Sequence, residues 1–220
     1  MKEVMMHTSS SLNIFLLRHG KPDFPHNGMV YYGSTDYPLS EEGFAQARRV
    51  QGDLKDVVFD KIYVSPMTRA KQTTEIVFPH LYKEAITVDD FREISFGTWE
   101  GKTFDEVRSE WDEVYGVPNT TFDRCTPPGG ETLFEVQQRV LSKFNEILEE
   151  NKSGNIVISA HNGVLWSILS HYFALPLKDV FFYNMDYCGI HILSYSDKIM
   201  KLLRFNWNSD ITNSPIRRMV

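Results

Sequence analysis

Two arginines and two histidines stand in three short polar clusters, and each cluster directly follows an apolar run of strand length. The clusters are Arg18-His19-Gly20, residues 65–69 ending in Arg69, and His161-Asn162-Gly163. Guanidinium groups bind phosphate oxygens in a fork-like geometry, and imidazoles add further donors. If the three clusters meet, they form a site for a phosphate ester.

The elements that must bring these clusters together are the strands of a sheet. Apolar runs at residues 13–17, 61–64 and 155–159 alternate with segments of helical period. This alternation predicts an α/β protein, a three-layer α/β/α sandwich with a mostly parallel central sheet. Ligands of such sheets bind beyond the carboxyl ends of the strands, where all three clusters lie.

Helices and a hairpin complete the expected fold. The first helix begins after Ser40, which can cap it, and its apolar positions are Phe44, Ala47, Val50 and Leu54. A second helix is predicted over residues 132–150, with Leu133, Val136, Val140, Phe144 and Ile147 along one side. Residues 164–173 suit a buried helix, and residues 189–195 and 198–205 suit a hairpin.

The length and composition fit one catalytic domain. The chain has 220 residues, of which 42% are hydrophobic and 24% charged, enough for a substantial core. We therefore expect a single domain over residues 1–220. Residues 1–12 are expected to be disordered, and residues 91–128, rich in aromatics, acids, Gly and Pro, are expected to form an insertion or lid.

Charge and cysteine content narrow the partners and the compartment. The net charge is −6, which argues against binding to nucleic acid or to an anionic membrane surface. No segment has the apolar length of a membrane span, and the first residues lack the apolar stretch of a signal peptide. Cys125 and Cys188 form no CxxC pair, so we expect a cytoplasmic protein.

Several motifs resemble the histidine phosphatase superfamily, the phosphoglycerate-mutase-like group, between about residues 14 and 173. They are Leu17-Arg18-His19-Gly20, SPMTRAKQT around Arg69, REISFGTWEG around Glu93, PPGGE at residues 127–131, and Ala160-His161-Asn162-Gly163. Residues 32–40, together with PPGGE, look most like the α-ribazole phosphatase branch.

The resemblance implies a role for each of five residues. His19 would be the nucleophile, and Glu93 would supply and later remove a proton. Arg18, Arg69 and His161 would hold the transferred phosphoryl group. Physical chemistry agrees, because cationic neighbours keep an imidazole unprotonated and stabilise the charge of a phosphoryl transition state. A phosphate dianion beside Glu93 would favour its protonated form. No metal and no cofactor is required.

The sequence departs from the family pattern at two places. Asn162 replaces the first glycine of an HGG motif, so it either adds a donor or narrows the pocket. Lys21-Pro22 follows the RHG motif where many mutase-like members carry Thr and Asn. We therefore expect the phosphate cradle to be completed by Lys21 or Asn27.

Three functions remain open. The first is a metal-independent phosphomonoester hydrolase that forms a phosphohistidine, with a small phosphorylated metabolite such as an α-ribazole phosphate-like compound as its substrate and partner. A phosphoglycerate mutase is the second, although the short segment before PPGGE favours water as acceptor. A binding module for a phosphate ligand without turnover is the third. The sequence does not indicate the oligomeric state, and a homodimer is one option.

Overall fold

The computed structural model describes residues 11–25, 30–107, 109, 126–181 and 185–207. Within these residues the strands form one sheet in the order β3-β2-β4-β1-β5-β6. Their bounds are β1 (Leu12–Arg18), β2 (Lys61–Val64), β3 (Ile86–Thr87), β4 (Gly154–Ala160), β5 (Ile190–Ser196) and β6 (Ile199–Trp207). β1 and β2 each pair with β4 in parallel, as does β3 with β2, whereas β5 is antiparallel to both β1 and β6. The prediction of a mostly parallel sheet is confirmed.

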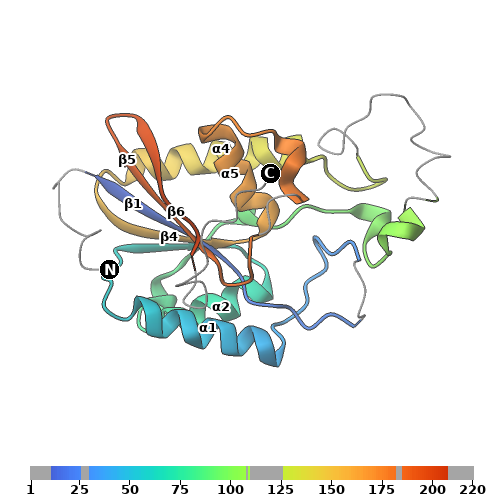
Figure 1. The fold of residues 1–220 in the computed structure, drawn as a ribbon, viewed down its shortest axis with the longest axis horizontal. Helices are drawn as coiled ribbons and strands as arrows, with labels where there is room; N and C mark the ends of the chain where they lie inside the picture. The colour runs from blue at the N-terminus through green and yellow to red at the C-terminus, as the bar shows by residue number, and fades with distance from the viewer. Residues whose placement is uncertain (1–10, 26–29, 108, 110–125, 182–184, 208–220) are drawn as a thin grey trace.

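Helices cover both faces of this sheet. The longer ones are α1 (Glu41–Leu54), α2 (Thr68–Val77), α4 (Leu133–Glu150) and α5 (Asn162–Tyr172). Short 3₁₀ helices are η1 (Tyr82–Glu84), η2 (Asp89–Phe91), η3 (Gly97–Trp99) and η5 (Leu177–Phe181). Figure 1 shows α1 and α2 on one side of the strands and α4 and α5 on the other. The predicted three-layer sandwich is thus confirmed.

The two faces carry separate hydrophobic cores. Side chains of β1 alternate between them, because successive residues of a strand point to opposite faces. Ile14 and Leu16 join the core under α4 and α5, whereas Phe15 and Leu17 join the core under α1 and α2. β1 is therefore buried on both sides, which explains its almost unbroken apolar sequence.

Capping residues fix where two of the helices begin. The Ser40 hydroxyl accepts a hydrogen bond from the Gly43 N–H at the start of α1. At the start of α4, Thr132 and Glu135 form a reciprocal capping box. The predicted inward positions of α4 are all buried. In α1 one position was wrong, because Gly43 is buried and Phe44 only half-buried.

Helix α2 was not predicted from the sequence. Its inward face consists of Arg69, Ala70, Thr73, Thr74 and Val77, so it has little apolar periodicity to reveal it. The Thr73 and Thr74 hydroxyls donate to carbonyl oxygens one turn earlier, which satisfies them inside the protein. Arg69 in the first turn of α2 belongs to the site, and the Thr73 hydroxyl accepts the Gly20 N–H at 3.0 Å, so part of the inward face of α2 is polar.

The regions predicted to be irregular are described in part. Leu12 is fully buried as the first residue of β1, and residues 1–10 lie outside the described structure. In the first part of the predicted insertion, the side chains of Phe91, Ile94, Phe96, Trp99 and Val107 are buried in the core. Residues 110–125 lie outside the described structure, so a lid over the site stays a prediction.

Candidate active site

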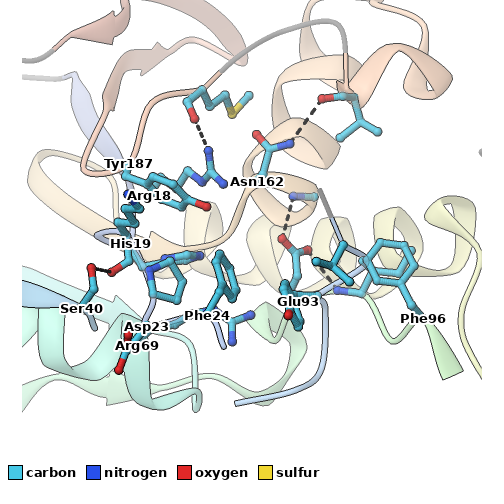
Figure 2. Close-up of a pocket in the computed structure, with 18 of the residues that line it drawn as sticks. Arg18, His19, Asp23, Phe24, Ser40, Arg69, Glu93, Phe96, Asn162 and Tyr187 are labelled. Atoms are coloured by element: carbon cyan, nitrogen blue, oxygen red, sulfur yellow. Dashed lines mark hydrogen bonds between the residues drawn. The ribbon is translucent and has the colours of Figure 1, made fainter. Parts of the chain in front are cut away.

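The three polar clusters meet at the carboxyl ends of β1, β2 and β4, as the sequence predicted. The imidazole rings of His19 and His161 have their centroids 4.9 Å apart. Arg18, His19, Arg69 and Glu93 line one cleft of about 980 Å³ (Figure 2). This volume is in the range of small-molecule sites.

Local contacts fix the protonation of His19. Its Nδ1 lies 2.7 Å from the Gly20 carbonyl oxygen. A carbonyl oxygen only accepts, so Nδ1 carries the proton of the neutral ring and Nε2 keeps a free lone pair. Burial, followed by the charges of Arg69 and Arg18, holds the pKa of His19 well below its usual value. At neutral pH the ring is therefore uncharged, with its Nε2 unprotonated.

Arg18 is held by residues that the sequence analysis did not single out. Its guanidinium lies over the Tyr187 ring, 4.1 Å from the centroid, and Nη1 donates to the Met185 carbonyl oxygen. Its buried Nε has no hydrogen-bond partner in the described part of the chain. Tyr187 and Met185 precede β5, and no motif in the sequence distinguishes them.

Arg69 reaches across from α2 to a loop before α1. Its two terminal nitrogens donate to the carbonyl oxygens of Gly33 and Thr35, at 2.7 and 2.9 Å. Asp36 lies 3.9 Å from the same guanidinium. These contacts use only some of the five N–H groups of an arginine, so donors remain for an anion.

Glu100 organises the loop that holds Arg69. Its carboxylate accepts hydrogen bonds from the backbone N–H groups of Gly33, Ser34, Thr35 and Phe96. Burial alone would raise the pKa of Glu100, but hydrogen bonds from Thr35, Phe96, Ser34 and Gly33 outweigh it, and the pKa is lowered. Glu100 was not predicted from the sequence, although it lies within the segment that carries Glu93.

His161 is completely buried behind His19 and is bonded to Ser65. The Ser65 hydroxyl lies 2.7 Å from Nε2 of His161, and it also accepts the Met67 N–H at 3.3 Å. The buried Nδ1 of His161 has no partner among the described groups. Burial, with Arg69, His19 and Arg18 as further causes, holds the pKa of His161 well below its usual value. Ser65 is the first residue of the polar cluster at residues 65–69 that follows β2.

Glu93 enters the cleft from the segment before η3. Its carboxylate accepts the N–H of Ile94 at 3.0 Å and the N–H of Gly163 at 3.2 Å. A Cβ on residue 163 would lie 2.5 Å from Oε1 of Glu93. The glycine therefore makes room for the carboxylate beside the N-terminus of α5 (Figure 2).

A salt-bridged pair from PPGGE and α4 supports the backbone around Glu93. Arg139 binds Glu131 through Nε at 2.9 Å and also donates to the Arg92 carbonyl oxygen at 2.9 Å. Glu131 accepts the Ser95 N–H at 3.0 Å. Residues on either side of Glu93 are thus tied to α4.

The three other residues predicted to contact the phosphate ester are Asn162, Lys21 and Asn27, and the structure describes two of them. Asn162 lines the cleft, but its amide nitrogen donates to the Val180 carbonyl oxygen at 3.3 Å, and its buried Oδ1 is without a partner in the described structure. Lys21 lines the cleft with its ammonium bonded to Glu42 at 2.5 Å. Asn27 lies outside the described residues.

The described residues contain no group of three or more His, Cys, Asp or Glu side chains placed to hold a metal ion. No helix among them has the length and apolarity needed to cross a membrane.

Known proteins resemble this chain over most of its length. The model of the histidine phosphatase superfamily (branch 1) matches residues 14–208. The chain is 30% identical over 158 residues to the uncharacterized phosphatase PhoE of Bacillus subtilis, covering 71% of this chain and 75% of that one. It is 31% identical over 180 residues to a 2,3-bisphosphoglycerate-dependent phosphoglycerate mutase of Parvibaculum lavamentivorans, covering 78% and 85% of the two chains. The crystal structure of the alpha-ribazole phosphatase from Shigella flexneri has a TM-score of 0.78 at 25% identity, covering 89% and 96%.

Proposed function

The chain belongs to branch 1 of the histidine phosphatase superfamily, and we propose that it is a metal-independent phosphomonoesterase that forms a phosphohistidine on His19. One observation carries the proposal. A neutral, buried imidazole, with its Nδ1 bonded to a carbonyl oxygen, lies in a cleft that two arginines also line. Such an arrangement suits attack on phosphorus, because the cations attract the phosphate while keeping the nucleophile unprotonated.

In the first step Nε2 of His19 attacks the phosphorus atom and the bond to the ester oxygen breaks. Negative charge spreads over the equatorial phosphoryl oxygens, where the remaining N–H groups of Arg18 and Arg69 stabilise it. The Ser65 hydroxyl donates a hydrogen bond to Nε2 of His161, so the proton of that neutral ring lies on Nδ1, which has no partner among the described residues. That Nδ1–H is then a further donor to the phosphoryl group.

Glu93 completes the proton transfers. Protonated Glu93 gives its proton to the leaving alcohol oxygen, so that a neutral alcohol departs. The carboxylate then accepts a proton from water as the water oxygen attacks the phosphohistidine. The phosphorus–nitrogen bond breaks, and inorganic phosphate and free His19 are regenerated. Contacts of Asn162 and Lys21 with the bound ester stay predictions from the sequence, because the Asn162 amide nitrogen is bonded to Val180 and the Lys21 ammonium to Glu42.

Phosphoglycerate mutase is the second candidate, because the Parvibaculum lavamentivorans relative that bears this name is 31% identical. A mutase must return the phosphoryl group to an alcohol and protect its phosphohistidine from water. The cytoplasmic location and a non-catalytic binding role also remain predictions from the sequence.

Rapid-quench experiments with a phosphate-labelled aryl ester test the proposal. We expect an acid-labile, base-stable phosphoprotein that decays to inorganic phosphate, unchanged by chelator and absent in His19→Ala. His171→Ala, on an exposed residue of α5, is the matched control. Hydrolysis by His19→Ala at the wild-type rate would disprove the proposal, and label that moves only between two alcohols would select the mutase.

A further inference from the structure

Part of the cleft lining differs in chemistry from the arginines and His19. Its aromatic and aliphatic side chains are Phe24, Tyr32, Ile94, Phe96, Phe104 and Leu133. Phe24 and Tyr32 are stacked, with ring centroids 4.3 Å apart and planes 7° from parallel. Figure 2 shows Phe96 on the far side of Glu93 from His19. This part of the cleft would contact the alcohol portion of an ester.

Apart from the two arginines, the charged side chains of the described lining are mostly carboxylates. Asp23, Glu41 and Glu42 line the cleft and are exposed. The ammonium of Lys21 is bonded to Glu42, so its charge is already compensated. Arg18 and Arg69 are the other described cations of the lining, and in the proposed function both bind the phosphate dianion. A second anionic group on the substrate would therefore meet repulsion and no uncompensated cation in the described lining.

One more polar atom of the lining is an acceptor. The Asn162 amide nitrogen is committed to the Val180 carbonyl oxygen, which leaves its buried Oδ1 without a partner in the described structure. A buried acceptor without a donor carries a free-energy cost. A substrate hydroxyl or N–H group can satisfy this atom, whereas a carboxylate cannot.

We propose that this region is a leaving-group subsite for a ring-bearing alcohol that carries no negative charge. The proposal rests on the phosphomonoesterase function above and specifies its substrate class. Stacked rings at Phe24 and Tyr32 favour a flat apolar group. The carboxylates at Asp23, Glu41 and Glu42 tolerate a neutral or cationic substituent and disfavour an anionic one.

A matched series of aryl phosphates tests the charge preference. The three probes are para-methylphenyl, para-aminomethylphenyl and para-carboxymethylphenyl phosphate, which place a neutral, a cationic and an anionic group at the same position. For the wild-type enzyme we expect kcat/KM to be about tenfold lower for the anionic ester than for the neutral one. Asp23→Asn combined with Glu42→Gln should close most of that gap, because it removes two repulsions and frees Lys21. Glu149→Gln, an exposed carboxylate on α4, is the control and should preserve the gap.

A second comparison tests the aromatic wall. Phe24→Ala should lower kcat/KM for para-methylphenyl phosphate about tenfold while changing that for glycerol phosphate much less. An equal loss for both esters would overturn the stacking role.

The outcomes separate the inference from the function on which it rests. Equal hydrolysis of the three aryl esters, or preference for the anionic one, overturns the subsite and leaves the phosphomonoesterase standing. Hydrolysis of none of them, without any phosphohistidine on rapid quench, overturns both.

Discussion

The backbone N–H of Gly163 donates to the Glu93 carboxylate across 3.2 Å, and a Cβ on residue 163 would lie only 2.5 Å from the other carboxylate oxygen. Gly163→Ala should therefore push Glu93 out of position without touching the arginines. We expect kcat/KM for an alkyl phosphate to fall at least about tenfold, because misplacing a catalytic group is costly. The Ki for inorganic phosphate, which measures phosphate binding by Arg18 and Arg69, should change little.

Gly52→Ala is the control for this substitution. Gly52 lies in α1 with open space around its missing side chain, so alanine there should preserve kcat/KM and raise the thermal midpoint. If Gly163→Ala and Gly52→Ala both kept the wild-type kcat/KM, the proposed proton transfer by Glu93 would be contradicted.

The proposed proton transfer from Glu93 can be tested through the leaving group. Glu93→Gln keeps the size of the side chain but cannot give up a proton. For an alkyl phosphate we expect kcat/KM to fall by about two to four orders of magnitude. For para-nitrophenyl phosphate the loss should be much smaller, because that phenolate leaves without protonation. Equal losses for the two esters would rule out a general acid at position 93.

Glu100 should support phosphate binding from a distance. Glu100→Gln supplies one acceptor oxygen where a carboxylate now accepts four backbone N–H groups. The loop that holds Arg69 should loosen, and we expect the Ki for inorganic phosphate to rise about tenfold with a smaller change in kcat. Glu84→Gln, on an exposed residue of η1, is the control. A phosphate Ki in Glu100→Gln equal to that of the wild type would show that the loop keeps Arg69 in place without the Glu100 carboxylate.

Acid stability should depend on a histidine outside the cleft. His191 on β5 is fully buried, and burial with the charge of Arg18 lowers its pKa from 6.5 to about 3. Between these two pKa values the unfolded chain binds a proton at His191 and the folded chain does not. The contribution of neutral His191 to the unfolding free energy is therefore complete above pH 6.5 and is lost as the pH falls toward 3. The loss across the window is roughly 4 kcal/mol of unfolding free energy.

His191→Asn tests this assignment by urea denaturation across the same pH window. Asparagine can still accept the Asn206 N–H that now bonds Nδ1 at 3.0 Å, but it does not titrate. We expect the slope of unfolding free energy against pH to decrease by an amount that corresponds to up to one proton taken up on unfolding. His171→Asn is the control, and an identical change in that variant would contradict the assignment.

The convergence of the site could be predicted because it follows from local sequence. Each of Arg18, His19 and His161 directly follows an apolar strand, and parallel strands bring such positions to one edge. Glu93 follows no predicted strand, and only its resemblance to a family motif identified it. Its placement beside Gly163 is now visible.

The supporting contacts could not be predicted, because they join residues that are distant in the sequence. Glu100 binds the loop at residue 33 and Ser65 binds His161, and neither pairing leaves a periodic or compositional trace. α2 was missed for a related reason, since its inward face is polar and hydrophobic period is the main signal for a helix. Lys21 had the expected type for a phosphate ligand, but its pairing with Glu42 depends on where α1 begins.

The position of β1 has a consequence for biosynthesis. Of the described strands, β1 comes earliest in the chain, yet its neighbours in the sheet are residues 154–160 and 190–196. The side chains of Asn13 and Asn155 bond across a separation of 142 residues. During synthesis this strongly apolar segment therefore stays unpaired until those residues have been added, and during that interval it is exposed to aggregation.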